Sequence, residues 1–129
     1  MSNFNLVPPL ASRPRGENRN GTQGVHRLLE AARTASTAVA GAVTSNVHKG
    51  IVTSEALTTA ALALYTLTLT NSKITANSNV ICSVDKNGST GEPTILNITP
   101  AAGSVVINVK NEHAATALNA AIKIRFDVL

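Results

Sequence analysis

The sequence of 129 residues carries a net charge of +4 at neutral pH, and its length predicts one compact domain with an appendage. Aromatic residues make up only 2% of the chain, which excludes a core built around large rings. The single cysteine, Cys82, excludes an intrachain disulfide framework, and no apolar run approaches the roughly 18 residues of a membrane-spanning helix. We therefore expect a core of Val, Ile, Leu and Ala, a reducing compartment, no membrane partner, and Cys82 as a small buried apolar residue.

Residues 1–24 are predicted to form an extended basic arm. Pro8, Pro9 and Pro14 exclude a regular helix there, and frequent Gly and Asn residues give the backbone further freedom. The start of the chain lacks the basic segment and apolar stretch of a signal peptide, so none is expected. Apolar residues within the arm favour docking onto a partner over a purely solvated tail; they include Phe4, Leu6 and Leu10.

Residues 25–49 are predicted to form a helix or linker. In "VHRLLEAARTASTAVAGAV" the apolar residues follow a helical spacing, which predicts a helix from Val25 to about Thr34. After that point Ser, Thr and Gly41 weaken the pattern. For residues 36–50 both a helix and a strand are therefore compatible with the sequence.

From residue 50 onward the apolar period changes to two. Alternating segments include "LYTLTLT", "NVICSVD", "SVVINVK" and "AIKIRFDVL", with "GIVTSEAL" and the shorter "TILNIT" beside them. Strict alternation is typical of strands with one buried and one wet face, which form mainly antiparallel sheets. The sequence thus predicts a mainly β fold: a small antiparallel β-sandwich or jelly roll of about six short strands over residues 50–129, preceded by the arm and a helix.

Two connections carry specific expectations. In "TPAAGS", Pro100 is predicted at the second position of a hairpin turn and Gly103 at its end. The stretch "NEHAATALNA" is too long for a hairpin turn. We expect it to cross between the two sheets, with Leu118 entering the core.

Residue types that carry chemistry are few and scattered. His26, His48 and His113 have no partner at a spacing typical of metal ligands. The sequence has no nucleophile elbow, phosphate-binding loop or dinucleotide fingerprint. We therefore expect a non-enzymatic protein without a metal site or cofactor.

The net charge lies entirely in the first 50 residues. Six basic and two acidic residues give +4 there, whereas five of each cancel in residues 51–129. The basic set could neutralise nucleic-acid phosphates, dock onto an acidic protein surface, or merely solubilise the chain. Because the arm lacks stacking aromatics and a dense basic cluster, we favour protein docking and expect no nucleic-acid partner; the arginines concerned are Arg13, Arg15, Arg19, Arg27 and Arg33.

Size favours self-association. A β domain of about 80 residues with few aromatics buries a limited core, and oligomerisation is a common remedy. The Thr-rich alternating faces and Ala-rich segments are compatible with a homotrimer.

Residues 51–129 resemble a small β module found in structural proteins of tailed bacteriophages. The segments that carry the likeness are "ALTTAALALYTLTLTNSKIT", "ITPAAGSVVINVKN" and "ALNAAIKIRFDV". Such modules occur in head decoration (cement) proteins and head fibres. The resemblance implies a non-enzymatic virion protein, made in the host cytoplasm, that binds the major capsid protein on the outside of the capsid and stabilises the shell against DNA pressure.

The arm would then serve as the attachment. We expect its arginines, Arg27 and Arg33 included, to meet capsid carboxylates, and its apolar residues to fill shallow pockets. Two alternatives stay open at this point. One is a fibre or tail module that recognises a host surface, and the other is an internal virion protein that binds nucleic acid through the basic arm.

Overall fold

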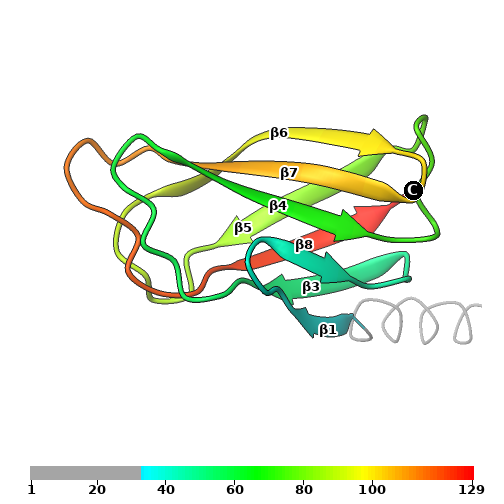
Figure 1. Cartoon of the computed structure of the whole chain (residues 1–129), viewed down its shortest axis with the longest axis horizontal. Coiled ribbons are helices and arrows are strands. Elements are labelled where there is room, and N and C mark those ends of the chain that lie inside the picture. The colour runs from blue at the N-terminus through cyan, green and yellow to red at the C-terminus, as the bar shows by residue number, and fades with distance from the viewer. Residues whose placement is uncertain (1–32) are drawn as a thin grey trace, which may run out of the picture. The chain divides into compact units, whose positions relative to one another are not determined.

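The computed structural model describes residues 33–129, which form a β-sandwich of two four-stranded sheets (Figure 1). The chain divides into two units, residues 1–33 and residues 34–129, and the sandwich is the second. The described residues contain no helix. The eight strands are β1 (Thr34–Thr37), β2 (Ala42–Thr44), β3 (Lys49–Thr53), β4 (Leu64–Thr70), β5 (Val80–Asp85), β6 (Pro93–Ala101), β7 (Ser104–Asn111) and β8 (Lys123–Val128).

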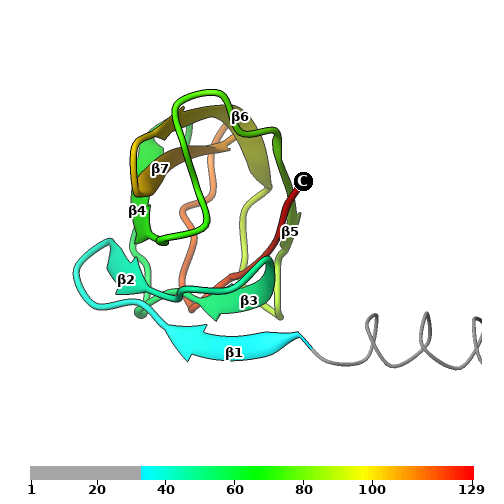
Figure 2. The ribbon, with the colours of Figure 1, turned by 90° about the vertical axis from the view of Figure 1, so that its right-hand side faces the viewer.

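The strand order is β1-β3-β8-β5 in one sheet, here sheet A, and β2-β4-β7-β6 in the other, sheet B. Figure 2 looks along the sandwich and shows the two sheets as its opposite walls. Four of the strand pairs are antiparallel, as predicted, whereas β1–β3 and β2–β4 are parallel. A tight turn at Ala40 and Gly41, both with positive φ (51° and 77°), takes the chain from β1 directly to β2 in the other sheet.

The core lies between the sheets and is almost entirely aliphatic. The predicted inward residues of three strands are buried, which confirms their alternation: Tyr65, Leu67 and Leu69 in β4, Val105, Ile107 and Val109 in β7, and Ile124, Phe126 and Val128 in β8. Phe126 packs over Gly50 of the neighbouring strand, where a Cβ atom would lie only 2.5 Å from the ring. The absence of a side chain at Gly50 therefore makes room for Phe126, the one large ring that is fully buried among residues 33–129.

The helix predicted from Val25 to about Thr34 lies almost entirely outside the described residues, and its last residue, Thr34, begins a strand instead. Residues 34–44 form β1, the turn and β2, so the sandwich begins at Thr34 and has eight strands rather than about six. The strand alternative for residues 36–50 is the one adopted. The physical reason is tertiary: the Thr68 N–H donates to the Gly41 carbonyl (2.8 Å), and Ala38 and Val43 are buried against the sheets. Residues 25–32 and the arm lie outside the described residues.

The turn of the β6–β7 hairpin differs from the prediction in its position. Pro100 lies within β6 opposite Val105, and the two-residue loop consists of Ala102 and Gly103. Pro100 is tolerated because β6 is an edge strand, where a missing N–H breaks no central ladder. Gly103 has a φ of 79°, the left-handed conformation that the turn requires.

The long connection after β7 crosses from sheet B to sheet A, as predicted, and Leu118 is 1% exposed within the core. It meets the 54–63 and 86–92 connections at one end of the sandwich (Figure 1). The fully buried side chain of Asn111 joins all three. Its Nδ2 donates to the carbonyls of Thr59 (3.3 Å), Ala60 (3.3 Å) and Thr116 (2.9 Å), and its Oδ1 accepts the N–H groups of Glu92 (3.0 Å) and His113 (3.2 Å).

A second fully buried amide, Asn71, closes the opposite end. Its Nδ2 donates to the carbonyl of Val47 (2.6 Å) and its Oδ1 accepts the N–H of Lys73 (2.9 Å). Its backbone N–H donates to the carbonyl of Gly103 (2.9 Å) in the β6–β7 turn. Each end of the sandwich is thus held by one asparagine. Asn111 is the last residue of β7 in sheet B, and Asn71 directly follows β4 of the same sheet.

Replacing the Asn111 amide should destabilise the whole domain. We expect Asn111→Asp to lower the free energy of unfolding by about 3 kcal/mol or more, because three carbonyls lose a donor and a carboxylate becomes buried. Asn108→Asp, on the outer face of the same strand and partly exposed, is the matched control and should change it by less than about 1 kcal/mol. Urea unfolding of both variants measures this, and equal stabilities would contradict the role of Asn111.

Candidate protein-contact surface

The two outer faces of the sandwich differ in their chemistry. Outward positions of sheet A carry five charged side chains among eleven. They are Ala35, Thr37, Lys49, Ile51, Thr53, Ile81, Ser83, Asp85, Lys123, Arg125 and Asp127. This charged face is a mixture of both signs.

Outward positions of sheet B carry one charged side chain among fifteen, Lys110. They are Ala42, Thr44, Leu64, Thr66, Thr68, Thr70, Thr94, Leu96, Asn97, Thr99, Ala101, Ser104, Val106, Asn108 and Lys110. We call this surface the uncharged face. Six of its members are threonines, which the outward positions of an alternating strand favour.

A relay of side-chain hydrogen bonds crosses the uncharged face. Thr66 donates through Oγ1 to Asn108 Oδ1 (2.8 Å), and Asn108 donates through Nδ2 to Asn97 Oδ1 (2.7 Å). These residues stand side by side on β4, β7 and β6. The relay fixes the two amides in one orientation, so the middle of the face presents an ordered set of polar groups.

Exposed apolar side chains lie on the same face. Leu64 at the start of β4 and Leu96 at the bulge in β6 are each 51% exposed. Val106 is partly exposed in the centre of the sheet. Core regions of protein–protein interfaces are depleted of charge, and the uncharged face shares this property.

Four of the five charged side chains on the other face form two ion pairs. Lys49 lies 4.0 Å from Asp127, and Arg125 lies 3.6 Å from Asp85. The N–H of Asn87 (2.9 Å) and then the Arg125 guanidinium hold the pKa of Asp85 below its ordinary value. Such exposed pairs are compatible with a face that stays in water.

Most of the predicted site residues cannot be placed. Phe4, Leu6, Leu10, Arg13, Arg15, Arg19 and Arg27 lie outside the described residues. Arg33, the residue directly before β1, is partly exposed. The alternation in the sequence predicted Thr-rich outward positions but did not single out a face. The sheet order was needed to bring β4, β7 and β6 together.

Two titratable side chains of the described residues, Cys82 and Tyr65, belong to the core or pack against it. No group of three or more His, Cys, Asp or Glu residues there is placed to hold a metal ion. Burial, with the nearby Asp127 carboxylate, raises the pKa of the Cys82 thiol to about 12. Cys82 packs against the core but is partly buried, rather than buried as expected. Burial and a hydrogen bond to Glu55 (2.9 Å) raise the pKa of the Tyr65 hydroxyl.

Searches against protein families, curated proteins and solved structures each returned no match. Within residues 33–129, no helix is long and apolar enough to cross a membrane.

Cys82 should be unreactive in the folded protein. A pKa of about 12 leaves on the order of one thiol in ten thousand ionised at pH 8, and the thiolate is the reactive form. We expect iodoacetamide to modify the folded chain at least about a hundredfold more slowly than the urea-unfolded chain. Mass spectrometry of timed samples measures both rates, and equal rates would contradict this environment.

Stability should also fall in alkali. The folded chain keeps the Cys82 and Tyr65 protons to a higher pH than the unfolded chain does. Between the ordinary pKa that each group has in the unfolded chain and its higher pKa in the folded chain, the unfolded state binds fewer protons. The free energy of unfolding therefore decreases as the pH rises through this range. Urea unfolding from pH 8 upward should show this loss, and it should be smaller in Cys82→Ala. An identical pH dependence of both proteins would rule out the contribution of Cys82.

Proposed function

We propose that this chain is a non-enzymatic structural protein of a bacteriophage virion that binds the outside of the capsid and stabilises the shell. The observation that carries the proposal is the uncharged face, whose fifteen outward positions include one charged side chain. In the sequence a basic arm precedes the sandwich. The likeness of residues 51–129 to phage decoration modules supports the same function.

The size of the uncharged face indicates that it does not act alone. Seven residues of β4 span about 24 Å, and the four strands of the sheet span about 14 Å between the outermost axes. The projected area is a few hundred Å², whereas a stable interface buries about 800 Å² on each partner. A firm attachment therefore needs additional contacts.

The arm is the natural source of those contacts. Twenty-four residues reach at most about 80 Å when fully extended, far enough to contact neighbouring capsid subunits. Its arginines suit capsid carboxylates, and Phe4, Leu6 and Leu10 suit apolar pockets. In a homotrimer, three arms and three faces would act together and raise the avidity without any single tight contact.

Deleting residues 1–24 should abolish binding to shells while the sandwich stays folded. The assay is co-sedimentation with emptied shells of the encoding virus, stripped of this chain. Circular dichroism checks the fold of the truncated protein. Undiminished binding by the truncated chain would contradict attachment through the arm, as would binding of the full chain to DNA with no affinity for shells.

A matched pair of variants tests the uncharged face. Val106→Glu places a carboxylate in its centre, and Ile51→Glu makes the same change on the charged face. Both residues are β-branched, outward and partly exposed in inner strands. We expect Val106→Glu to weaken shell binding at least about tenfold, as burying an unpaired charge at an interface does, and Ile51→Glu to change it little. The reverse order would place the contact on sheet A.

A further inference from the structure

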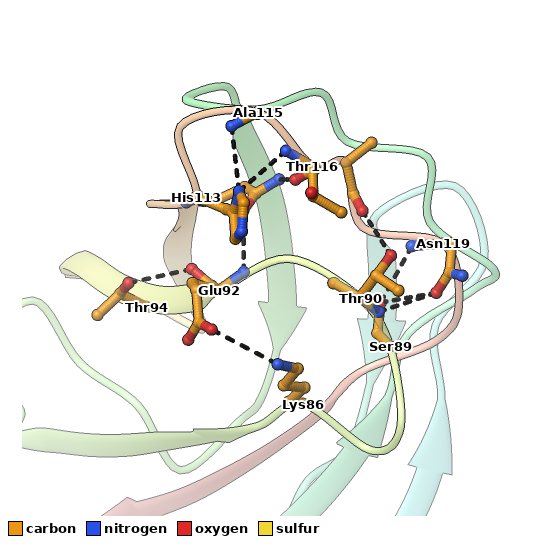
Figure 3. A network of polar contacts seen from close by, with 11 residues as sticks. Lys86, Ser89, Thr90, Glu92, Thr94, His113, Ala115, Thr116 and Asn119 are labelled. Carbon is orange, nitrogen blue, oxygen red and sulfur yellow. Dashed lines mark hydrogen bonds and ion pairs between the residues drawn. The ribbon is translucent and has the colours of Figure 1, made fainter.

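His113 lies in the β7–β8 connection and closes its first turn. Its Nδ1 accepts the backbone N–H groups of Ala115 (3.0 Å) and Thr116 (3.0 Å) (Figure 3). A ring nitrogen that accepts hydrogen bonds carries a lone pair and no proton. In this arrangement the imidazole is therefore neutral, with its proton on Nε2.

The turn is coupled to the buried amide that joins the three connections. Asn111 Oδ1 accepts the His113 N–H (3.2 Å), and Asn111 Nδ2 donates to the Thr116 carbonyl (2.9 Å). The His113 ring thus fixes the two N–H groups on one side of the turn, while Asn111 fixes the turn from the other. Opening the turn withdraws one of the three carbonyls that Asn111 binds.

We propose that His113 is a proton-operated latch, in which protonation of Nδ1 releases the turn of residues 113–116 and loosens this end of the sandwich. The imidazolium has no acceptor on Nδ1, and its new N–H points at two N–H donors. Both hydrogen bonds are lost together. Histidine is the side chain that most often serves as a proton-sensitive switch in proteins.

Of the three carboxylates on the segments around the turn, two are paired with lysines. The 86–92 connection contributes Glu92, which lies 3.6 Å from Lys86 (Figure 3), and Glu112 lies 3.6 Å from Lys110. On the 54–63 connection, Glu55 accepts a hydrogen bond from the Tyr65 hydroxyl. The carboxylates favour the imidazolium, whereas the lysines disfavour it. Because acid also protonates the carboxylates, the test needs a variant that keeps every one of them.

His113→Asn is that variant. An asparagine Oδ1 accepts main-chain N–H groups two residues ahead in the same manner, but it does not titrate. His48→Asn is the matched control, since His48 is the other histidine of the described residues and lies near the Val128 carbonyl (3.4 Å), remote from the turn in sequence.

The experiment is NMR spectroscopy of the full chain between about pH 8 and about pH 5. We expect ¹⁵N shifts that report a proton on Nε2 at the higher pH, followed by protonation of Nδ1. Amide protection at Ala115 and Thr116, corrected for intrinsic exchange, should then fall about tenfold or more, as the loss of two hydrogen bonds implies. The loss should recur in His48→Asn and be absent in His113→Asn.

Two results would overturn the latch. One is a proton on Nδ1 of His113 at about pH 8. The other is amide protection that changes with pH to the same extent in the unmodified chain and in His113→Asn, because the carboxylates would then account for it.

Discussion

Two buried asparagine amides hold the ends of the sandwich, and the loops depend on them. Strand pairing and an aliphatic core fix the middle of the domain. The core also includes Leu57, Ile74 and Leu118 from the long connections, but apolar side chains do not satisfy the backbone N–H and C=O groups there. Asn111 ties three connections at one end through five hydrogen bonds, and Asn71 ties two at the other. Buried amides of this kind are stabilising only when nearly every donor and acceptor is satisfied, so each fixes the backbone around it in one arrangement. The buried Gly91, with a φ of 82°, illustrates the tightness: a Cβ there would lie 2.9 Å from Leu118 and 3.0 Å from Asn111 Oδ1.

Because buried hydrogen bonds hold the loops at both ends, the outer faces of the two sheets remain as the surfaces that can bind a partner. The alternation of each strand sends its aliphatic residues inward and leaves the outward positions to decide what each sheet contacts. Sheet A places both signs of charge outward, and neighbouring strands pair them. Sheet B places threonines and asparagines outward, and these bond to one another across three strands. When a partner covers the uncharged face, few charged groups lose their hydration. For this reason we propose that the uncharged face is the one that binds the partner.

Much of the sandwich could be predicted from alternation alone. The inward residues of β4, β7 and β8 follow from the period of the apolar residues, and the crossing of the last connection, with Leu118 in the core, follows from its length. The sequence left helix and strand open for residues 36–50 because small residues such as Ala38 satisfy a helical and an extended spacing equally, and sheet pairing decides between them. The roles of Asn71 and Asn111 had no local signal, since their partners lie up to 52 residues away. For the same reason the uncharged face could not be assembled before the order of β4, β7 and β6 was known.

The central claim is that the uncharged face meets the shell, and hydroxyl-radical footprinting of the shell-bound chain tests it most directly. Three aliphatic side chains of almost equal exposure serve as reporters: Leu64 and Leu96 on the uncharged face, each 51% exposed, and Ile81 on the charged face, 49% exposed. Our account predicts that Leu64 and Leu96 lose most of their reactivity on binding while Ile81 keeps its own. Protection of Ile81 with unchanged reactivity of Leu64 and Leu96 would contradict it.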